Sequence, residues 1–85
     1  SGLIEESSKP LAESSVTEKV VITKVADERY DLLGYLDTLE LRPGNSLEVV
    51  EKAPFDGPIT VRIDGKDRAL SREIASIIKV RTIEQ

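Results

Sequence analysis

Three carboxylates lie close together in the chain and are the residues best suited to chemistry: Asp27, Glu28 and Asp31. Hard divalent cations prefer several oxygen ligands, so three carboxylates within one helical turn could contribute to a shared metal site. The same residues also suit the start of a helix. There Asp27 would act as the N-cap, and the acids would interact favourably with the helix dipole. The spacing alone leaves both interpretations open.

The chain has no His, Cys or Met, which restricts the chemistry available to it. Nucleophilic or general-base catalysis would have to rest on carboxylates and Lys, and no paired arrangement of these stands out. No Gly-rich phosphate loop is present. Ser71 lacks a His or Cys partner and is interpreted as a helix cap. The sequence therefore predicts a protein that is not an enzyme.

Length and charge indicate a single small domain without a nucleic-acid-binding face. The 85 residues carry a net charge of −4, and the Lys and Arg residues are scattered rather than clustered. We therefore expect no DNA binding by this chain alone. No apolar run is long enough to span a membrane, and the absence of Cys is typical of a cytoplasmic protein. Ser1-Gly2 at the start resembles a processing or tag remnant, so a fragment of a longer protein is expected.

The elements that would position the carboxylates begin after a polar lead. Residues 1–18 are rich in Ser, Glu and Thr and are predicted to be a flexible linker or tail, with Leu11 as a single apolar anchor. The domain is expected to occupy residues 19–85. Residues 19–25 (KVVITKV) are rich in β-branched side chains and predict a strand. A helix should follow Asp27, because four leucines recur at helical spacing (Leu32, Leu33, Leu36 and Leu39). Gly34 lies in this helix and is interpreted as a close approach to a strand.

The second half of the chain predicts strands separated by sharp turns. Residues 46–52, 58–63, 66–70 and 78–81 read as strands. Pro43-Gly44 indicates a type II turn, and Asp64-Gly65 a type I′ hairpin. Ser71 would begin a short helical turn before the last strand. The fold class expected from these patterns is mainly β: a small five-stranded barrel with one α-helix after the first strand. An open five-stranded α+β sheet is the competing architecture.

Four stretches resemble a known family: residues 32–36 (LLGYL), 41–44 (LRPG), 47–63 (LEVVEKAPFDGPITVRI) and 69–75 (ALSREIA). Together they are similar to the C-terminal SH3-like domain of the diphtheria-toxin-repressor family of iron- or manganese-dependent repressors. The same domain type resembles FeoA, a small protein of bacterial ferrous iron uptake. The resemblance covers roughly residues 9–80.

The resemblance implies an accessory regulatory domain of a metal-dependent transcriptional repressor. Such a domain packs against a winged-helix DNA-binding domain and a dimerization domain. DNA would be bound only through the missing N-terminal domain, and Fe²⁺ or Mn²⁺ would be held in the full-length protein. A stand-alone FeoA-like protein of ferrous iron transport is the alternative. The acidic residues 27–33 and the lead at residues 10–13 look more like the repressor.

In iron-responsive repressors this domain lends a Glu and a Gln to one metal site. Those positions fall on Lys24 and Asp27 of this chain. A Lys cation cannot ligate, so the resemblance leaves Asp27, with Glu28 shifting into the second role, as accessory metal ligands. We expect no tightly bound metal in this chain alone. Glu40 stands where many relatives have Gly, which predicts a turn after the helix that is either strained or shaped differently.

Overall fold

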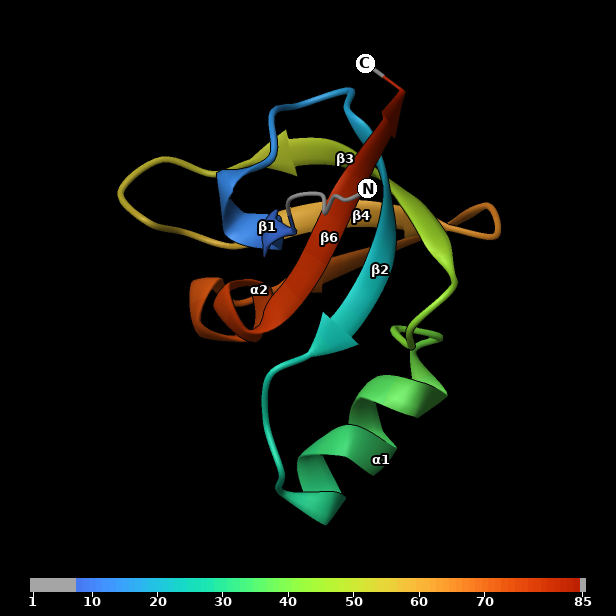
Figure 1. Ribbon diagram of the computed structural model, residues 1–85. Helices are drawn as coiled ribbons and strands as arrows, with labels where there is room; N and C mark the ends of the chain where they lie inside the picture. The colour runs from blue at the N-terminus through green and yellow to red at the C-terminus, as the bar shows by residue number, and fades with distance from the viewer. Residues whose placement is uncertain (1–7, 85) are drawn as a thin grey trace.

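The computed structural model describes residues 8–84 and is mainly β, as the sequence predicts (Figure 1). Its elements are β1 (Lys9–Pro10), the 3₁₀ helix η1 (Leu11–Glu13), β2 (Lys19–Val25), α1 (Tyr30–Thr38), β3 (Ser46–Lys52), β4 (Ile59–Ile63), β5 (Lys66–Leu70), α2 (Arg72–Ile77) and β6 (Ile78–Glu84). The described part of the chain thus has the five expected strands and one more, β1. None of its helices is long and apolar enough to cross a membrane.

The strands form one antiparallel sheet in the order β1-β6-β2-β3-β4-β5. The sheet is strongly curved, so β2 and β6 cross over β3 and β4 in Figure 1. Register shifts between Ile22 and Lys24 and between Val49 and Glu51 mark irregularities of the bulge type, which bend a strand and increase its twist. The strands β1 and β5 form the two edges of the sheet. The helix η1, which follows β1, contacts α2, which follows β5. This curvature produces the predicted SH3-like fold.

The core is built from side chains that alternate along the strands. Ile59, Val61 and Ile63 of β4 are buried, whereas Arg62 between them is exposed. The same alternation holds in β2 and β3, as a period of two requires. Each buried aliphatic side chain stabilises the fold by roughly 1.5–3 kcal/mol on leaving water. The core includes the following residues: Leu11, Val20, Ile22, Leu36, Leu41, Leu47, Val49, Ile59, Val61, Ile63, Leu70, Ala75, Ile78 and Val80.

The predicted turns and cap are confirmed. Gly44 has φ +95°, as the third position of a type II turn requires. Asp64 and Gly65 both have positive φ, the signature of the type I′ turn that connects β4 to β5. The hydroxyl of Ser71 accepts a hydrogen bond from the backbone N–H of Ile74 at 3.1 Å and so caps α2. Local turn chemistry therefore sets the β4-β5-α2 half of the fold.

Residues 8–18 belong to the fold, whereas the sequence predicted a flexible linker over residues 1–18. Lys9 and Pro10 pair with β6, and the following Leu11 is fully buried. The Nζ of Lys52 donates to the backbone carbonyls of Ala12 and Ser14 at 3.0 and 2.9 Å. Long-range contacts thus order a segment that has no periodicity of its own. Residues 1–7 of the expected linker lie outside the described residues.

The start of α1 differs from the prediction, whereas its end agrees with it. Asp27 is not its N-cap, because the helix begins at Tyr30 after Arg29, which makes no side-chain cap bond. At the other end Glu40 has φ +67°. The N–H of Leu41 bonds the carbonyl of Leu36, and that of Glu40 bonds the carbonyl of Asp37. This is a Schellman arrangement with Glu40 at the position that favours Gly. Strain at this residue is thus confirmed.

The interpretation of Gly34 as a close approach to a strand is wrong. A Cβ placed on Gly34 would have no atom within 4 Å. The residue is exposed, because α1 projects away from the sheet in Figure 1. Gly34 therefore lowers the stability of the helix without any packing that requires it.

Candidate functional site

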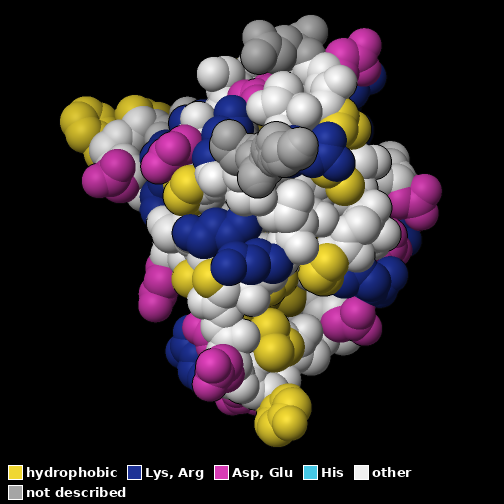
Figure 2. Space-filling view, in the orientation of Figure 1, with side chains coloured by type: hydrophobic (Ala, Val, Ile, Leu, Met, Phe, Trp, Pro, Cys, Tyr) yellow, Lys and Arg dark blue, Asp and Glu magenta, His cyan; other side chains and the backbone are white. Residues whose placement is uncertain are grey.

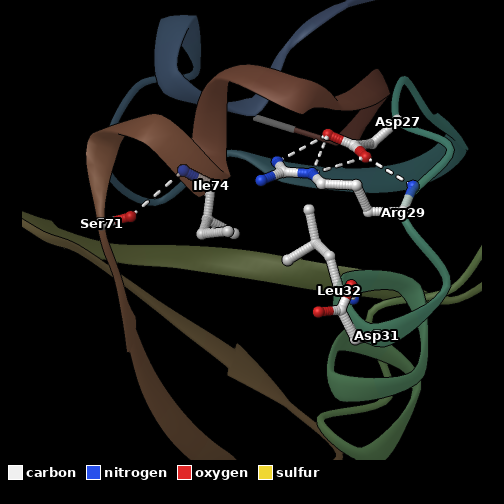
Figure 3. Close-up of polar contacts among 6 residues, drawn as sticks. All are labelled: Asp27, Arg29, Asp31, Leu32, Ser71 and Ile74. Atoms are coloured by element: carbon white, nitrogen blue, oxygen red, sulfur yellow. Dashed lines mark hydrogen bonds and ion pairs between the residues drawn. The ribbon is translucent and has the colours of Figure 1, made fainter.

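Asp27 lies in the connection between β2 and α1 and is engaged by Arg29 rather than by other acids. The guanidinium Nε lies 3.0 Å from Oδ1 of Asp27, and Nη2 lies 2.8 Å from Oδ2. The backbone N–H of Arg29 also donates to Oδ1 at 2.8 Å. Figure 3 shows the two side chains side by side, joined through both carboxylate oxygens. The result is a bidentate pair closed over a two-residue turn.

The pair sets the electrostatics of this carboxylate. Hydrogen bonds from the side chain and backbone of Arg29 lower the pKa of Asp27 to about 2. Asp27 is therefore ionised at neutral pH, which a metal ligand requires. Its oxygen atoms are, however, already occupied by a guanidinium. A cation could reach them only by displacing Arg29.

The other two carboxylates do not converge on Asp27. Asp31 is exposed on the first turn of α1, and its Oδ1 accepts the N–H of Leu32 at 2.9 Å. Figure 3 shows the Asp31 carboxylate beside Leu32 and apart from the pair formed by Asp27 and Arg29. Glu28 is exposed in the connection before the helix. Across residues 8–84, no three carboxylates, His or Cys are arranged to hold a metal ion. Ligation by Asp27 and Glu28 stays a prediction.

Lys24, the other position that the resemblance singles out, lies near the end of β2 on an open groove of about 370 Å³ between that strand and α1. The groove is mainly apolar, and its rim carries charges. At the rim, Nε of Arg42 donates to Oδ1 of Asp37 at 2.7 Å. No carboxylate within the described chain pairs with Lys24. The groove is lined by Lys24, Val25, Leu33, Leu36, Asp37, Leu41, Arg42 and Pro43.

Sequence reasoning missed a buried ionic cluster around Glu18. This residue is only 4 % exposed, and its Oε2 lies 2.7 Å from Nζ of Lys9. It also accepts the backbone N–H of Ser15 at 2.9 Å and the hydroxyl of Thr82. Burial by itself would raise the pKa of Glu18, but these bonds together lower it to about 2. No local sequence pattern indicates the cluster, because Thr82 lies 64 positions after Glu18.

The loop between β3 and β4 is a second feature that the sequence analysis did not single out as a site. Phe55 at its tip is fully exposed, and both Phe55 and Asp56 have positive φ. The base of the loop is fixed by Arg72, whose guanidinium donates to the carbonyls of Gly57 and Ala53 at 2.7 and 3.1 Å. The loop therefore presents an aromatic side chain to solvent on a braced backbone.

Comparison with known proteins agrees with the fold. The FeoA domain family matches residues 9–82. A crystal structure of an iron uptake regulatory protein (FeoA) is similar with a TM-score of 0.80 and 23 % identity, over 92 % of this chain and 100 % of that one. A search of curated protein sequences finds no match.

Two longer proteins are similar as well, and one of them is a metal-dependent repressor. A manganese-dependent transcriptional repressor in complex with manganese has a TM-score of 0.84 and 21 % identity, over 93 % of this chain and 38 % of that one. ScaR with bound Zn²⁺ has a TM-score of 0.80 and 26 % identity, over 95 % of this chain and 40 % of that one. The chain thus spans about two fifths of the length of these two proteins.

Proposed function

The chain belongs to the FeoA domain family, and we propose that it is the accessory regulatory domain of a metal-dependent transcriptional repressor. In this role it packs against the DNA-binding and dimerization domains of the same cytoplasmic protein and contacts DNA only through them. It performs no catalysis. It acts as a scaffold that offers a curved sheet, the loop held by Arg72 and the apolar groove between β2 and α1.

The likeness to the manganese-dependent transcriptional repressor carries this proposal. It extends over 93 % of the chain at 21 % identity, so it takes in most of the lead before β2 as well as the sheet. That lead is held by β1, by the burial of Leu11 and by the pair of Lys9 with Glu18. Because this lead is fixed to the sheet, it would couple the position of a preceding domain to that of the sheet.

The residues present do not fit a self-sufficient metal site. Oxygen ligands are all that the chain offers, and Asp27 is already bonded to Arg29. In this proposal Fe²⁺ or Mn²⁺ is held by the other domains. Asp27 and Glu28 assist at most by an accessory contact. That contact requires Arg29 to release Asp27 in the assembled protein.

A stand-alone FeoA-like protein of ferrous iron transport is the second candidate. It is favoured by one observation, which is that the chain covers 100 % of the iron uptake regulatory protein that it resembles. The two candidate proteins share the fold. They differ in whether a DNA-binding and a dimerization domain belong to the same protein.

The natural gene product decides between the two candidates. A winged-helix region and a helical dimerization region before this domain support the repressor. The full-length product should then bind its operator DNA only with Mn²⁺ or Fe²⁺ present, and a variant lacking residues 8–84 should respond less steeply to the metal. A natural product that consists of this domain alone contradicts the repressor and favours the FeoA-like role.

A further inference from the structure

Phe55 is presented to solvent by a loop whose backbone is strained. Phe55 has φ +58° and Asp56 has φ +56°, a left-handed conformation that non-Gly residues adopt at a cost of roughly 1–2 kcal/mol each. Two such residues in succession persist only where the surroundings enforce them. Here the loop is closed by backbone bonds from Ala53 to Pro58 and from Gly57 to Pro54, both 3.0 Å long.

Rigid aromatic side chains that lose little entropy on binding are typical anchors of protein interfaces. Phe55 is 100 % exposed, and the neighbouring Asp56 carboxylate is 95 % exposed even though Nη1 of Arg72 lies 4.0 Å from its Oδ1. Figure 2 shows hydrophobic side chains at the tip of the projecting loop, with acidic side chains beside them. The loop therefore offers an apolar group and a negative charge together.

The groove between β2 and α1 offers the complementary surface. Its floor is formed by Leu33, Leu36, Leu41 and Pro43, and its volume of about 370 Å³ is within the range of pockets that hold a small molecule. Lys24 on its rim has no ion-pair partner within residues 8–84. An apolar side chain flanked by a carboxylate would fill the floor and pair with this ammonium group.

We propose that the loop of residues 53–58 from one copy of the chain docks in the groove of a second copy, with Phe55 on the apolar floor and Asp56 beside Lys24. In Figure 1 the loop and α1 project from different sides of the molecule, so a loop does not fill the groove of its own chain. The contact is head-to-tail, and it leaves a free loop on one copy and a free groove on the other. The proposed contact applies both to a repressor domain and to a stand-alone FeoA-like protein.

Self-association of the purified chain tests the proposal. We expect the weight-average mass in sedimentation to rise with concentration, and amide shifts in NMR to change at residues 53–58 and around Lys24 and Leu33. Phe55→Ala should weaken association on the order of tenfold or more, because an anchor is lost. Ile83→Ala, which also truncates a half-exposed apolar side chain, is the matched control and should change nothing.

Mixing variants distinguishes this geometry from any other. Phe55→Ala keeps its groove, whereas Lys24→Asp keeps its loop. Each should associate poorly alone, and together they should form a dimer that stops at two chains. Combining Lys24→Asp with Asp56→Lys should restore self-association. A chain that stays monomeric at NMR concentrations, or a mixture that gains nothing over its separate components, overturns the proposal.

Discussion

Glu18 shows how one residue can depend on positions far apart in the chain. Its carboxylate joins Lys9 of β1 to Thr82 of β6 and also receives a backbone N–H from the turn at Ser15. A buried carboxylate costs free energy unless such bonds are made. Here they outweigh the cost of burial, since the pKa of Glu18 falls to about 2.

The stability of the fold should therefore decrease in acid. The pKa of Glu18 is lower in the folded chain than the ordinary value of 4.5. Its contribution is thus complete above pH 4.5 and is lost as the pH falls toward 2. The full contribution is on the order of 3 kcal/mol, since one pKa unit corresponds to about 1.4 kcal/mol. Urea unfolding measured from neutral pH to pH 2.5 checks this.

Glu18→Gln provides the comparison for that measurement. It should be less stable than the wild type at neutral pH, and the difference should shrink below pH 4.5, because Glu18 of the unfolded wild type then takes up a proton while the folded form keeps its charge. A difference that stays constant over the whole range would show that the carboxylate charge contributes nothing.

Glu40 is a residue whose replacement should stabilise the protein. Its φ of +67° suits Gly, which adopts this conformation without a steric penalty. We expect Glu40→Gly to raise the free energy of unfolding by about 1 kcal/mol. Urea denaturation checks the value. Glu51→Gly, the same exchange at an exposed strand position, should instead lower it.

At the scale of elements, α1 is the one that the sheet supports least. Leu36 is its only buried residue, and the helix contains Gly34 in open space. Gly34→Ala should therefore raise the free energy of unfolding by about 1 kcal/mol through helix propensity alone. Thermal denaturation of this variant measures the gain. Gly65→Ala is the opposite control and should destabilise, because Gly65 has φ +76°.

The elements that the sequence predicted correctly are those determined by local chemistry. Pro43-Gly44 and Asp64-Gly65 formed the expected turns, and the β-branched stretches formed strands. The elements that it missed depend on distant partners. β1 has two residues and no periodicity, and it is a strand only because β6 lies beside it. The start of α1 shifted because Arg29 engages the Asp that was expected to be its cap.

At the scale of the whole molecule, the same limit applies to the candidate site. The sequence identified Asp27, Glu28 and Asp31 by spacing, but spacing does not show that Arg29 neutralises the first of them. The groove was not predicted either, since its residues come from β2, α1 and the turn that follows the helix. Of its leucines, Leu33 and Leu36 were predicted only as part of one face of a helix.

These features lead to a prediction about metal. The isolated chain should bind Mn²⁺ weakly, with paramagnetic broadening spread over all carboxylates and only at millimolar metal, because Arg29 occupies Asp27. NMR titration checks this. Arg29→Ala would free the carboxylate and should increase broadening at residues 27–31. Saturable broadening of the wild type at low micromolar Mn²⁺, abolished by Asp27→Asn, would contradict the prediction.

Within residues 8–84, β6 is synthesised after the other strands, yet it lies inside the sheet between β1 and β2. Val21 pairs with Arg81, 60 positions later. At a translation rate of about 5–20 residues per second, β2 waits roughly 3–12 s on the ribosome for that partner. During this time the apolar residues Val20 and Ile22 have no β6 to cover them. The nascent chain therefore depends on rapid completion, and a stall before Ile78 would leave an unpaired strand open to chaperones or to aggregation.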